Sequence, residues 1–134
     1  WGAGTGAVTL ELARKASDGT VYAVERKPEA VALLHENRIK LGGYNVKIIE
    51  GPAPEALENL PAPDCVFVGG SGGRMREILE LAREKNPEVR VVVNAVALET
   101  LFAAQTALKE LGFLTSRSHS WQPRAASRSA RTPC

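Results

Sequence analysis

Short β-prone runs and longer helical segments alternate along the first 114 residues, and this alternation limits the possible folds more than any other feature. Apolar periodicity predicts strands at 21–25, 46–49, 65–68 and 89–93. The same periodicity predicts helices over 7–17, 28–41, 74–85 and 98–111, with a short helical piece at 54–60. Strands that alternate with helices are typical of a parallel sheet covered on both faces, so we expect an α/β fold.

The spacing of apolar residues also predicts which surfaces are buried. In the first helix, Val8, Leu12 and Ala16 share one face. The run at 89–93 is β-branched and almost continuous, which is typical of a strand buried on both faces. Cys65 begins a compact apolar strand, so we expect it in the core.

The composition favours one globular domain. The chain has 134 residues, of which 44% are apolar and 24% charged, which is enough for a buried core. We therefore expect one domain over residues 1–114. From Thr115 onward Ser, Arg, Ala and Pro dominate without periodicity, which predicts a disordered tail over 115–134.

The charge distribution does not support a nucleic-acid partner. The net charge is +2, but four arginines and no acid lie in residues 115–134, so the rest carries 13 basic against 15 acidic groups. Apolar stretches stay below the roughly 18 to 20 residues that span a bilayer. Cys65 and Cys134 form no metal or disulfide pattern. These features predict a cytoplasmic protein without a membrane partner or bound metal.

A glycine-rich turn precedes the first predicted helix, and an acid ends the next strand. The turn is Gly2-Ala3-Gly4-Thr5-Gly6, and Glu25 follows Gly4 by 21 residues. Glycines permit close backbone approach, the helix start supplies N–H groups, and the acid accepts hydrogen bonds from ribose hydroxyls. The pairing favours a nucleoside site over a plain turn with a solvated acid. Because the glycines fit both patterns, a dinucleotide and S-adenosylmethionine stay open.

Five segments then carry a family resemblance. They are GAGTG at 2–6, VYAVER at 21–26, EGPAPEAL at 50–57, VFVGGSGG at 66–73 and NAVALET at 94–100. In this order and spacing they resemble the precorrin-6 methyltransferases of cobalamin biosynthesis, which act on precorrin-6Y or cobalt-precorrin-6B. The resemblance implies a Rossmann-like class I fold. It also implies methylation of carbon 15 of a corrin precursor with decarboxylation of an acetate side chain; fused members also methylate carbon 5.

The resemblance further implies the cofactor S-adenosyl-L-methionine and its contacts. The glycine turn would lie beside the methionine portion, Glu25 would bind the ribose, and the turn after residue 50 would lie beside adenine. The expected cofactor residues are Gly2, Ala3, Gly4, Thr5, Gly6, Glu25, Arg26, Gly51 and Ala53.

A second glycine loop and the residues after the last strand are expected to bind the precorrin. Ligands of open α/β sheets lie beyond the carboxyl ends of the strands, where free amides and the adjacent Arg74 can hold tetrapyrrole carboxylates. A plain turn explains the glycines equally well, and an acid also suits the first turn of the last helix. The expected substrate residues are Gly70, Ser71, Gly72, Gly73, Asn94, Glu99 and Thr100.

Methyl transfer from a sulfonium needs alignment more than acid–base chemistry, so no catalytic residue is assigned and His35 is expected to be a bystander. Relatives suggest a homo-oligomer. The chain departs from the family in three ways: a first strand is expected to be missing, Pro52 stands where an acid meets adenine, and residues 115–134 do not resemble the last two strands. The open alternatives are an RNA or protein methyltransferase of the same fold, an NAD-binding oxidoreductase and an inactive fragment.

Overall fold

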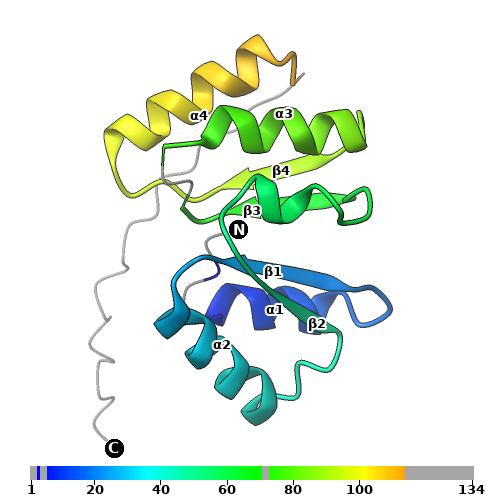
Figure 1. Cartoon of the computed structure of the whole chain (residues 1–134). Coiled ribbons are helices and arrows are strands. Elements are labelled where there is room, and N and C mark those ends of the chain that lie inside the picture. Colours follow the sequence, from blue (N-terminus) through cyan, green and yellow to red (C-terminus); the bar gives the residue numbers. More distant parts are fainter. Residues whose placement is uncertain (1–2, 4–5, 71–72, 114–134) are drawn as a thin grey trace, which may run out of the picture.

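Strands and helices alternate along the chain as the sequence predicts. The computed structural model describes residues 3, 6–70 and 73–113 (Figure 1). In chain order the elements are α1 (Ala7–Lys15), β1 (Val21–Glu25), α2 (Pro28–Lys40), β2 (Val46–Glu50), the 3-10 turn η1 (Glu55–Leu57), β3 (Cys65–Val68), α3 (Met75–Lys85), β4 (Arg90–Val93) and α4 (Leu98–Glu110). The predicted segment at 115–134 lies outside the described residues.

The strands pair in parallel, in two separate pairs. β1 pairs with β2 in a register that aligns Val21 with Val46 and Glu25 with Glu50. β3 pairs with β4, and among the described strands β1 and β3 are not hydrogen-bonded neighbours. Figure 1 shows the carboxyl ends of β1, β3 and β4 on the same side, at the left. The parallel arrangement is confirmed, and it brings the loops that follow the strands to one edge.

The helices cover opposite faces of the strands. Successive side chains of a strand point to opposite faces, so each face has its own core. α1 and α2 pack against one side of β1 and β2, whereas α3 and α4 lie over β3 and β4 on the opposite face, as Figure 1 shows. The buried residues of the first core are Leu10, Ala13, Ala23, Leu34 and Val46. The second core includes Val24, Leu57, Val66, Val68, Met75, Ile78, Leu79 and Ala82.

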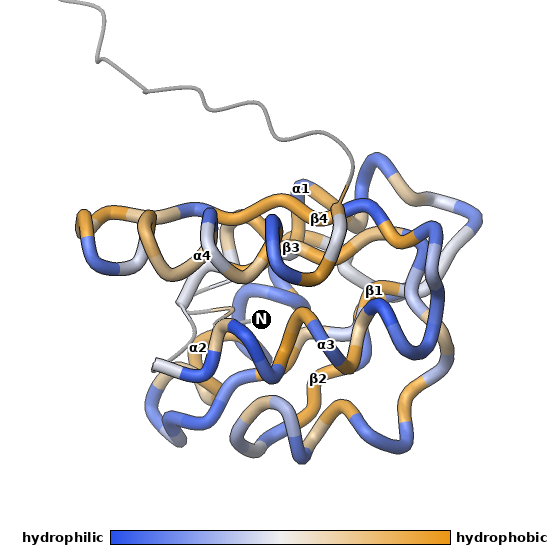
Figure 2. The backbone as a smooth tube through the Cα atoms, turned by 90° about the horizontal axis from the view of Figure 1, so that it is seen from above, coloured by the Kyte–Doolittle hydropathy of each residue, from blue (hydrophilic) through white to orange (hydrophobic). Residues whose placement is uncertain are grey.

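α3 shows most clearly why these segments form helices on a surface. Its apolar residues recur every three or four positions, which places them on one face. Met75, Ile78, Leu79 and Ala82 are buried, while the charged side chains between them face solvent. Figure 2 shows α3 alternating between orange and blue, whereas the strands are mainly orange. None of the described helices is long and apolar enough to cross a membrane.

The predicted apolar face of the first helix is wrong. Thr9, Leu10 and Ala13 are buried in α1, whereas Val8 and Leu12 are 44% and 37% exposed. Close packing of Leu10 on the segment after α2 accounts for this orientation, because a Cβ on Gly43 would lie only 2.7 Å from Leu10 Cδ2. The position of this glycine therefore sets the rotation of α1 about its axis.

The prediction that the last strand is buried on both faces is also wrong. In β4, Arg90 is exposed and Val92 is 52% exposed, whereas Val91 and Val93 pack against the second core. α3 and α4 cover one side of β4, and the described chain leaves the other side open to solvent. The β-branched run thus reflects strand propensity as well as burial.

At the edge opposite the carboxyl ends, the side chain of Asn45 connects the end of α1 to the start of β2. Asn45 Nδ2 donates to the carbonyl oxygens of Ala13 and Ala16 at 3.0 Å and of Gly19 at 3.3 Å. Asn45 comes directly before β2, so its amide ties the end of α1 and the following turn to the start of that strand. Carbonyl groups at a helix end need such partners.

Candidate functional site

The glycine turn before α1 lies beside the end of β1. The Ala3 N–H donates to the Val24 carbonyl oxygen at 3.4 Å, and the Gly6 N–H donates to the Ala3 carbonyl oxygen at 2.9 Å. Gly2, Gly4 and Thr5 lie outside the described residues. The two described residues therefore bring the predicted turn to within one residue of Glu25 on the neighbouring strand.

Gly6 is a position that only glycine satisfies. Its φ of 90° is left-handed, and a Cβ built there would lie well inside 3.0 Å of the Leu34 Cδ1 methyl of α2. Gly6 is the N-cap of α1 and brings no capping side chain, and the first turn of α1 contains no acid. The amino end of α1 therefore keeps its positive potential toward the carboxyl edge of the strands.

Glu25 is a buried carboxylate at the end of β1. It is 7% exposed, and its Oε1 accepts hydrogen bonds from the Arg26 and Lys27 N–H groups, both at 3.0 Å. These two backbone donors fix the direction of the carboxylate. The Arg26 side chain itself is exposed, and its backbone N–H is one of the two groups that order the carboxylate.

The turn after β2 lies directly against Glu25. The Gly51 N–H donates to the Glu25 carbonyl oxygen at 3.0 Å. Gly51 has a φ of 151°, and a Cβ there would lie 3.2 Å from the Ala56 Cβ, so a side chain would crowd η1. Ala53 and Ala56 are half-buried against the second core. Glu25 and Gly51, predicted from distant parts of the sequence, are thus neighbours.

The described residues among those predicted for the substrate follow β3 and β4 at the same edge. Gly70 and Gly73 are exposed after β3, and Gly73 has a φ of 85°. The Asn94 N–H extends the β3–β4 ladder by donating to the Val68 carbonyl oxygen at 2.9 Å, and its side chain is exposed. Ser71 and Gly72 lie outside the described residues.

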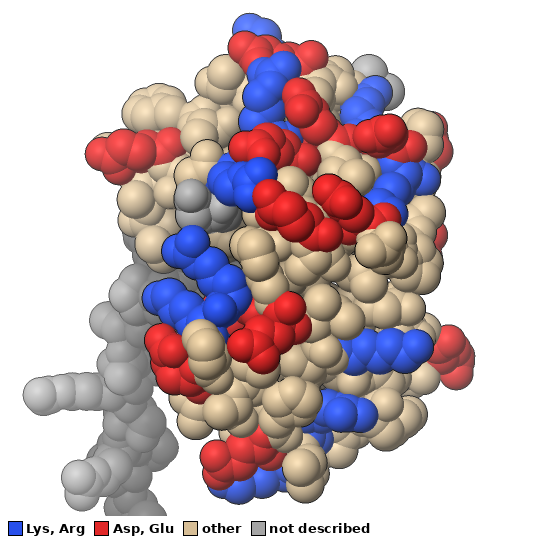
Figure 3. Space-filling view, viewed as in Figure 1, with Lys and Arg blue, Asp and Glu red and all other residues tan. Residues whose placement is uncertain are grey.

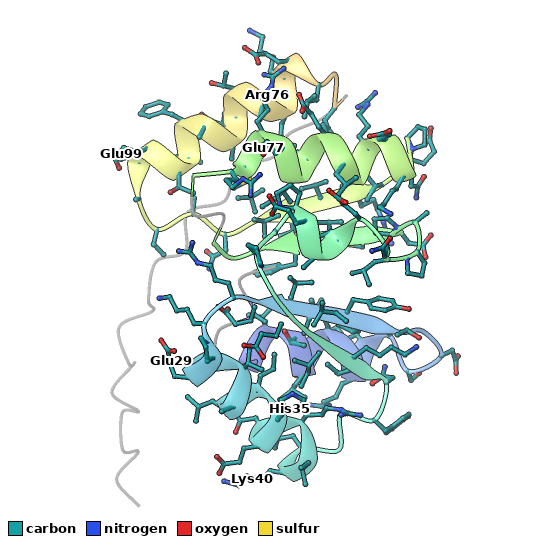
Figure 4. The ribbon with its side chains drawn as sticks, viewed as in Figure 1. Glu29, His35, Lys40, Arg76, Glu77 and Glu99 are labelled. Carbon is teal, nitrogen blue, oxygen red and sulfur yellow. The ribbon has the colours of Figure 1, made fainter. Side chains whose placement is uncertain are left out.

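Glu99 and Thr100 occupy the first turn of α4. Glu99 is exposed and Thr100 is half-buried. Figure 4 shows Glu99 at the left end of α4, directed away from the strands. An acid in this position suits the helix start, so the alternative weighed from the sequence accounts for Glu99 without a ligand.

Arg74 is engaged by protein carboxylates, contrary to the expectation that it is available to a substrate. Its Nη1 lies 2.5 Å from Glu55 Oε1, and its Nη2 lies 2.5 Å from Glu77 Oε2. Its hydrogen bonds hold the carboxyl pKa of Glu55 and of Glu77 below the ordinary value of 4.5. The same contacts, first with Glu77 and then with Glu55, raise the pKa of the guanidinium. Arg74 is therefore paired with two carboxylates of the protein itself, Glu55 and Glu77.

Sequence reasoning missed the Glu55–Arg74 contact. The two residues are 19 positions apart, on η1 and just before α3, so no helical or strand period joins them. Charged pairs are frequent on this face: Figure 3 shows red and blue side chains interleaved over α3 and α4. Arg76, labelled in Figure 4, contacts Glu80 at 3.0 Å and also Glu110.

Two other candidates lie apart from this edge. His35 is exposed on α2 (Figure 4), and its bystander role stays a prediction. Cys65 is exposed rather than in the core, because its side chain projects from the open side of β3. Within residues 3, 6–70 and 73–113, no group of three or more His, Cys, Asp or Glu side chains is arranged to hold a metal ion.

Parallel strands, helices on both faces and a set of loops at the carboxyl edge define a Rossmann-like α/β domain. Comparison with known proteins narrows this class. A family model described as "Precorrin methyltransferase domain" matches residues 1–126. The chain belongs to this family of precorrin methyltransferases.

Named relatives agree with the family match. A protein of Methanothermobacter thermautotrophicus named "Probable cobalt-precorrin-6B C(15)-methyltransferase (decarboxylating)" is 47% identical over 114 residues, which are 84% of this chain and 58% of that protein. The cobalt-precorrin-6B C(15)-methyltransferase (decarboxylating) of Salmonella typhimurium is 37% identical over 112 residues, 83% of this chain and 57% of that protein.

Solved structures give the same result for the fold. The precorrin-6y C5,15-methyltransferase of Geobacter metallireducens superposes with a TM-score of 0.80 at 38% identity, covering 83% of this chain and 60% of that one. The precorrin 8w decarboxylase of Methanobacterium thermoautotrophicum superposes with a TM-score of 0.78 at 47% identity and the same coverage. The chain therefore spans about 60% of the length of these relatives.

Proposed function

We propose that this chain binds S-adenosylmethionine at the carboxyl edge and belongs to an enzyme that methylates a ring carbon of a precorrin-6 type tetrapyrrole. In this reaction an acetate side chain loses CO₂, and the macrocycle accepts the electron pair of the broken C–C bond. The observation that carries the proposal is the buried Glu25 carboxylate, oriented by two backbone N–H groups and flanked by Ala3 and Gly51.

The described residues fit a nucleoside-containing cofactor. Backbone donors fix the direction of the Glu25 carboxylate, and a carboxylate is the acceptor that suits the hydroxyl groups of a ribose. The amino end of α1 offers its N–H groups and positive potential to the carboxylate of an amino-acid moiety. Gly51 and Ala53 form a surface without long side chains, suited to a flat base. Pro52 brings no carboxylate for the adenine amino group, so the base is held here by contact alone.

When bound, S-adenosylmethionine supplies an activated methyl group on a sulfonium. The task of this chain is then alignment, which is worth about 7 to 11 kcal/mol in well-oriented reactions. Gly70, Gly73 and Asn94 are exposed beyond β3 and β4, and we infer that their polar groups bind the carboxylate side chains of the tetrapyrrole. No acid or base is needed for the methyl transfer itself.

Titration calorimetry tests the cofactor site. We expect the chain to bind S-adenosylmethionine and S-adenosylhomocysteine, and Glu25→Gln to weaken binding by roughly 10- to 150-fold, the value of hydrogen bonds to a charged group. Glu50→Gln is the matched control, since Glu50 pairs with Glu25 in the β1–β2 register but is exposed. Equal losses in both variants, or no heat with the folded chain, would contradict the proposal.

Labelled methyl transfer tests the substrate and the alternatives. Incorporation of label into a precorrin-6 type tetrapyrrole, with release of CO₂, is the expected result. Label in tRNA or protein instead would favour another methyltransferase of the same fold, and saturable NADH binding would favour an oxidoreductase. Cofactor binding without transfer to any of these acceptors would identify the chain as a binding fragment of the enzyme.

We also propose that the chain forms a homo-oligomer and lies in the cytoplasm. Val92 of β4, Val96 of the segment that follows it and Phe102 of α4 are apolar and more than half exposed, as expected for a surface that contacts other protein. Light scattering at several concentrations measures whether the chain forms a homo-oligomer. A monomer at all concentrations would remove that part of the proposal.

A further inference from the structure

The segment from Gly51 to Pro63 is fastened to α3 at both ends. At the carboxyl end of α3, Lys85 Nζ donates to the Glu58 and Leu60 carbonyl oxygens, both at 2.7 Å, and Asn86 Nδ2 donates to the Pro63 carbonyl oxygen at 2.8 Å. Leu57, in the middle of the segment, is buried. At the amino end of α3, Arg74 contacts Glu55 of η1.

Only the fastening by Arg74 lies near the candidate site. Glu55 follows Gly51 by four residues, and the Gly51 N–H is bonded to the Glu25 carbonyl oxygen. Within this turn the Ala56 and Leu57 N–H groups donate to the Pro52 and Pro54 carbonyl oxygens at 2.9 and 2.8 Å. A displacement of Glu55 is therefore transmitted through a few hydrogen-bonded residues to the contact between Gly51 and Glu25.

The helix α3 explains the arginine at position 74 only in part. Arg74 is the N-cap of α3, where a cation opposes the helix dipole. Its guanidinium is only partly exposed and contacts one carboxylate in its own first turn, Glu77, and one on a separate segment, Glu55. The fork of N–H donors on arginine suits this double pairing, which a lysine ammonium cannot reproduce with the same geometry.

We propose that Arg74 is a positioning residue, which holds the Gly51–Leu57 turn against the amino end of α3 and so keeps the wall of the cofactor site in place. This inference rests on the proposed function, because the wall has a purpose only if a cofactor binds there. Arg74 acts on this wall through its contact with Glu55. An exposed ion pair contributes little to global stability, so its effect should be local.

Hydrogen exchange of the native chain, read by mass spectrometry, measures the local effect. Arg74→Gln should speed exchange of the Ala56 and Leu57 amides, and Glu55→Gln should do the same. The double variant should exchange no faster than either single variant, because both remove one contact. Glu77→Gln keeps the contact between segments and should leave these amides unchanged. Unchanged exchange in Arg74→Gln would overturn the inference.

Calorimetry with S-adenosylhomocysteine measures the consequence for the site. Arg74→Gln should raise Kd by about 2- to 10-fold, as expected when one more segment must be ordered on binding. Lys85→Gln is the control: it releases the far end of the same segment and should leave Kd unchanged. If the wild-type chain binds and Arg74→Gln leaves Kd unchanged, this inference alone fails. If the folded wild-type chain does not bind, the proposed function fails with it.

Discussion

Gly6→Ala is the sharpest test of how the glycine turn is held. Two separate features of the structure oppose a side chain at this position. The backbone has a φ of 90°, and the added methyl group would overlap the Leu34 Cδ1 methyl. Leu34 is fully buried, so it has little room to move aside.

The expected loss follows from these two features. Left-handed backbone costs an L-residue about 1–2 kcal/mol, and an extra methyl group in a packed core costs about 1–3 kcal/mol. We therefore expect Gly6→Ala to lower the free energy of unfolding by about 2–5 kcal/mol, a large part of the stability of an ordinary domain. Urea denaturation followed by far-UV circular dichroism measures it.

Two control variants separate the features. Gly42 has a φ of 70° and no atom within 4 Å of a built Cβ, so Gly42→Ala should lose only the backbone contribution of about 1–2 kcal/mol. In the double variant Gly6→Ala/Leu34→Ala, the smaller side chain makes room, and the total loss should fall below the sum of the single losses. A loss for Gly6→Ala no larger than that for Gly42→Ala would refute the reasoning.

Three further predictions concern the cores and the charges. Asn45→Ala should cost about 1–3 kcal/mol because it leaves carbonyl groups without their donor; a loss under about 0.5 kcal/mol in urea denaturation would count against this role. Ile78→Ala should cost about 2–5 kcal/mol, whereas Ile39→Ala, at an 81% exposed position, should stay within about 0.5 kcal/mol; similar losses would contradict the assigned core. The Glu55 carboxyl pKa lies below 4.5 because of its hydrogen bond from Arg74, so the pair's contribution to stability is present above 4.5 and is lost as the pH falls through the lowered pKa. Carbon NMR should show the Glu55 midpoint rising in Arg74→Gln, and an unchanged midpoint would disprove the contact.

Periodicity predicts the order and type of the elements because apolar residues recur at helical spacing in the helices and form short β-prone runs in the strands. The bounds at 65–68 and the start at Pro28 agree with the structure, since a short apolar run and a proline mark them locally. The rotation of α1 could not be predicted, because it depends on the room that Gly43 leaves for Leu10. The open side of β4 could not be predicted either, because a β-branched run looks the same whether one or both faces are covered.

Some features of the candidate site could likewise be predicted from the sequence, and others could not. The proximity of Glu25 to Ala3 and Gly51 follows from strand order, because parallel strands bring the loops at their carboxyl ends to one edge. The pairing of Arg74 could not be predicted, since its partner Glu55 is set by how η1 packs on α3. The same chain position that suggests a free cation in the sequence is, in the folded protein, already neutralised by two acids.

Adjacent side chains of β1 serve different cores, Ala23 beneath α1 and α2 and Val24 beneath η1, α3 and α4. The two strand pairs share no ladder among the described residues. β1 therefore couples the unfolding of the two cores, together with β2, whose Ile48 and Ile49 also pack against different cores. Scanning calorimetry should then give a single transition whose van't Hoff enthalpy equals the calorimetric enthalpy. Val24→Ala should weaken this coupling, so that the calorimetric peak divides into two transitions, one for each core, before either core is lost.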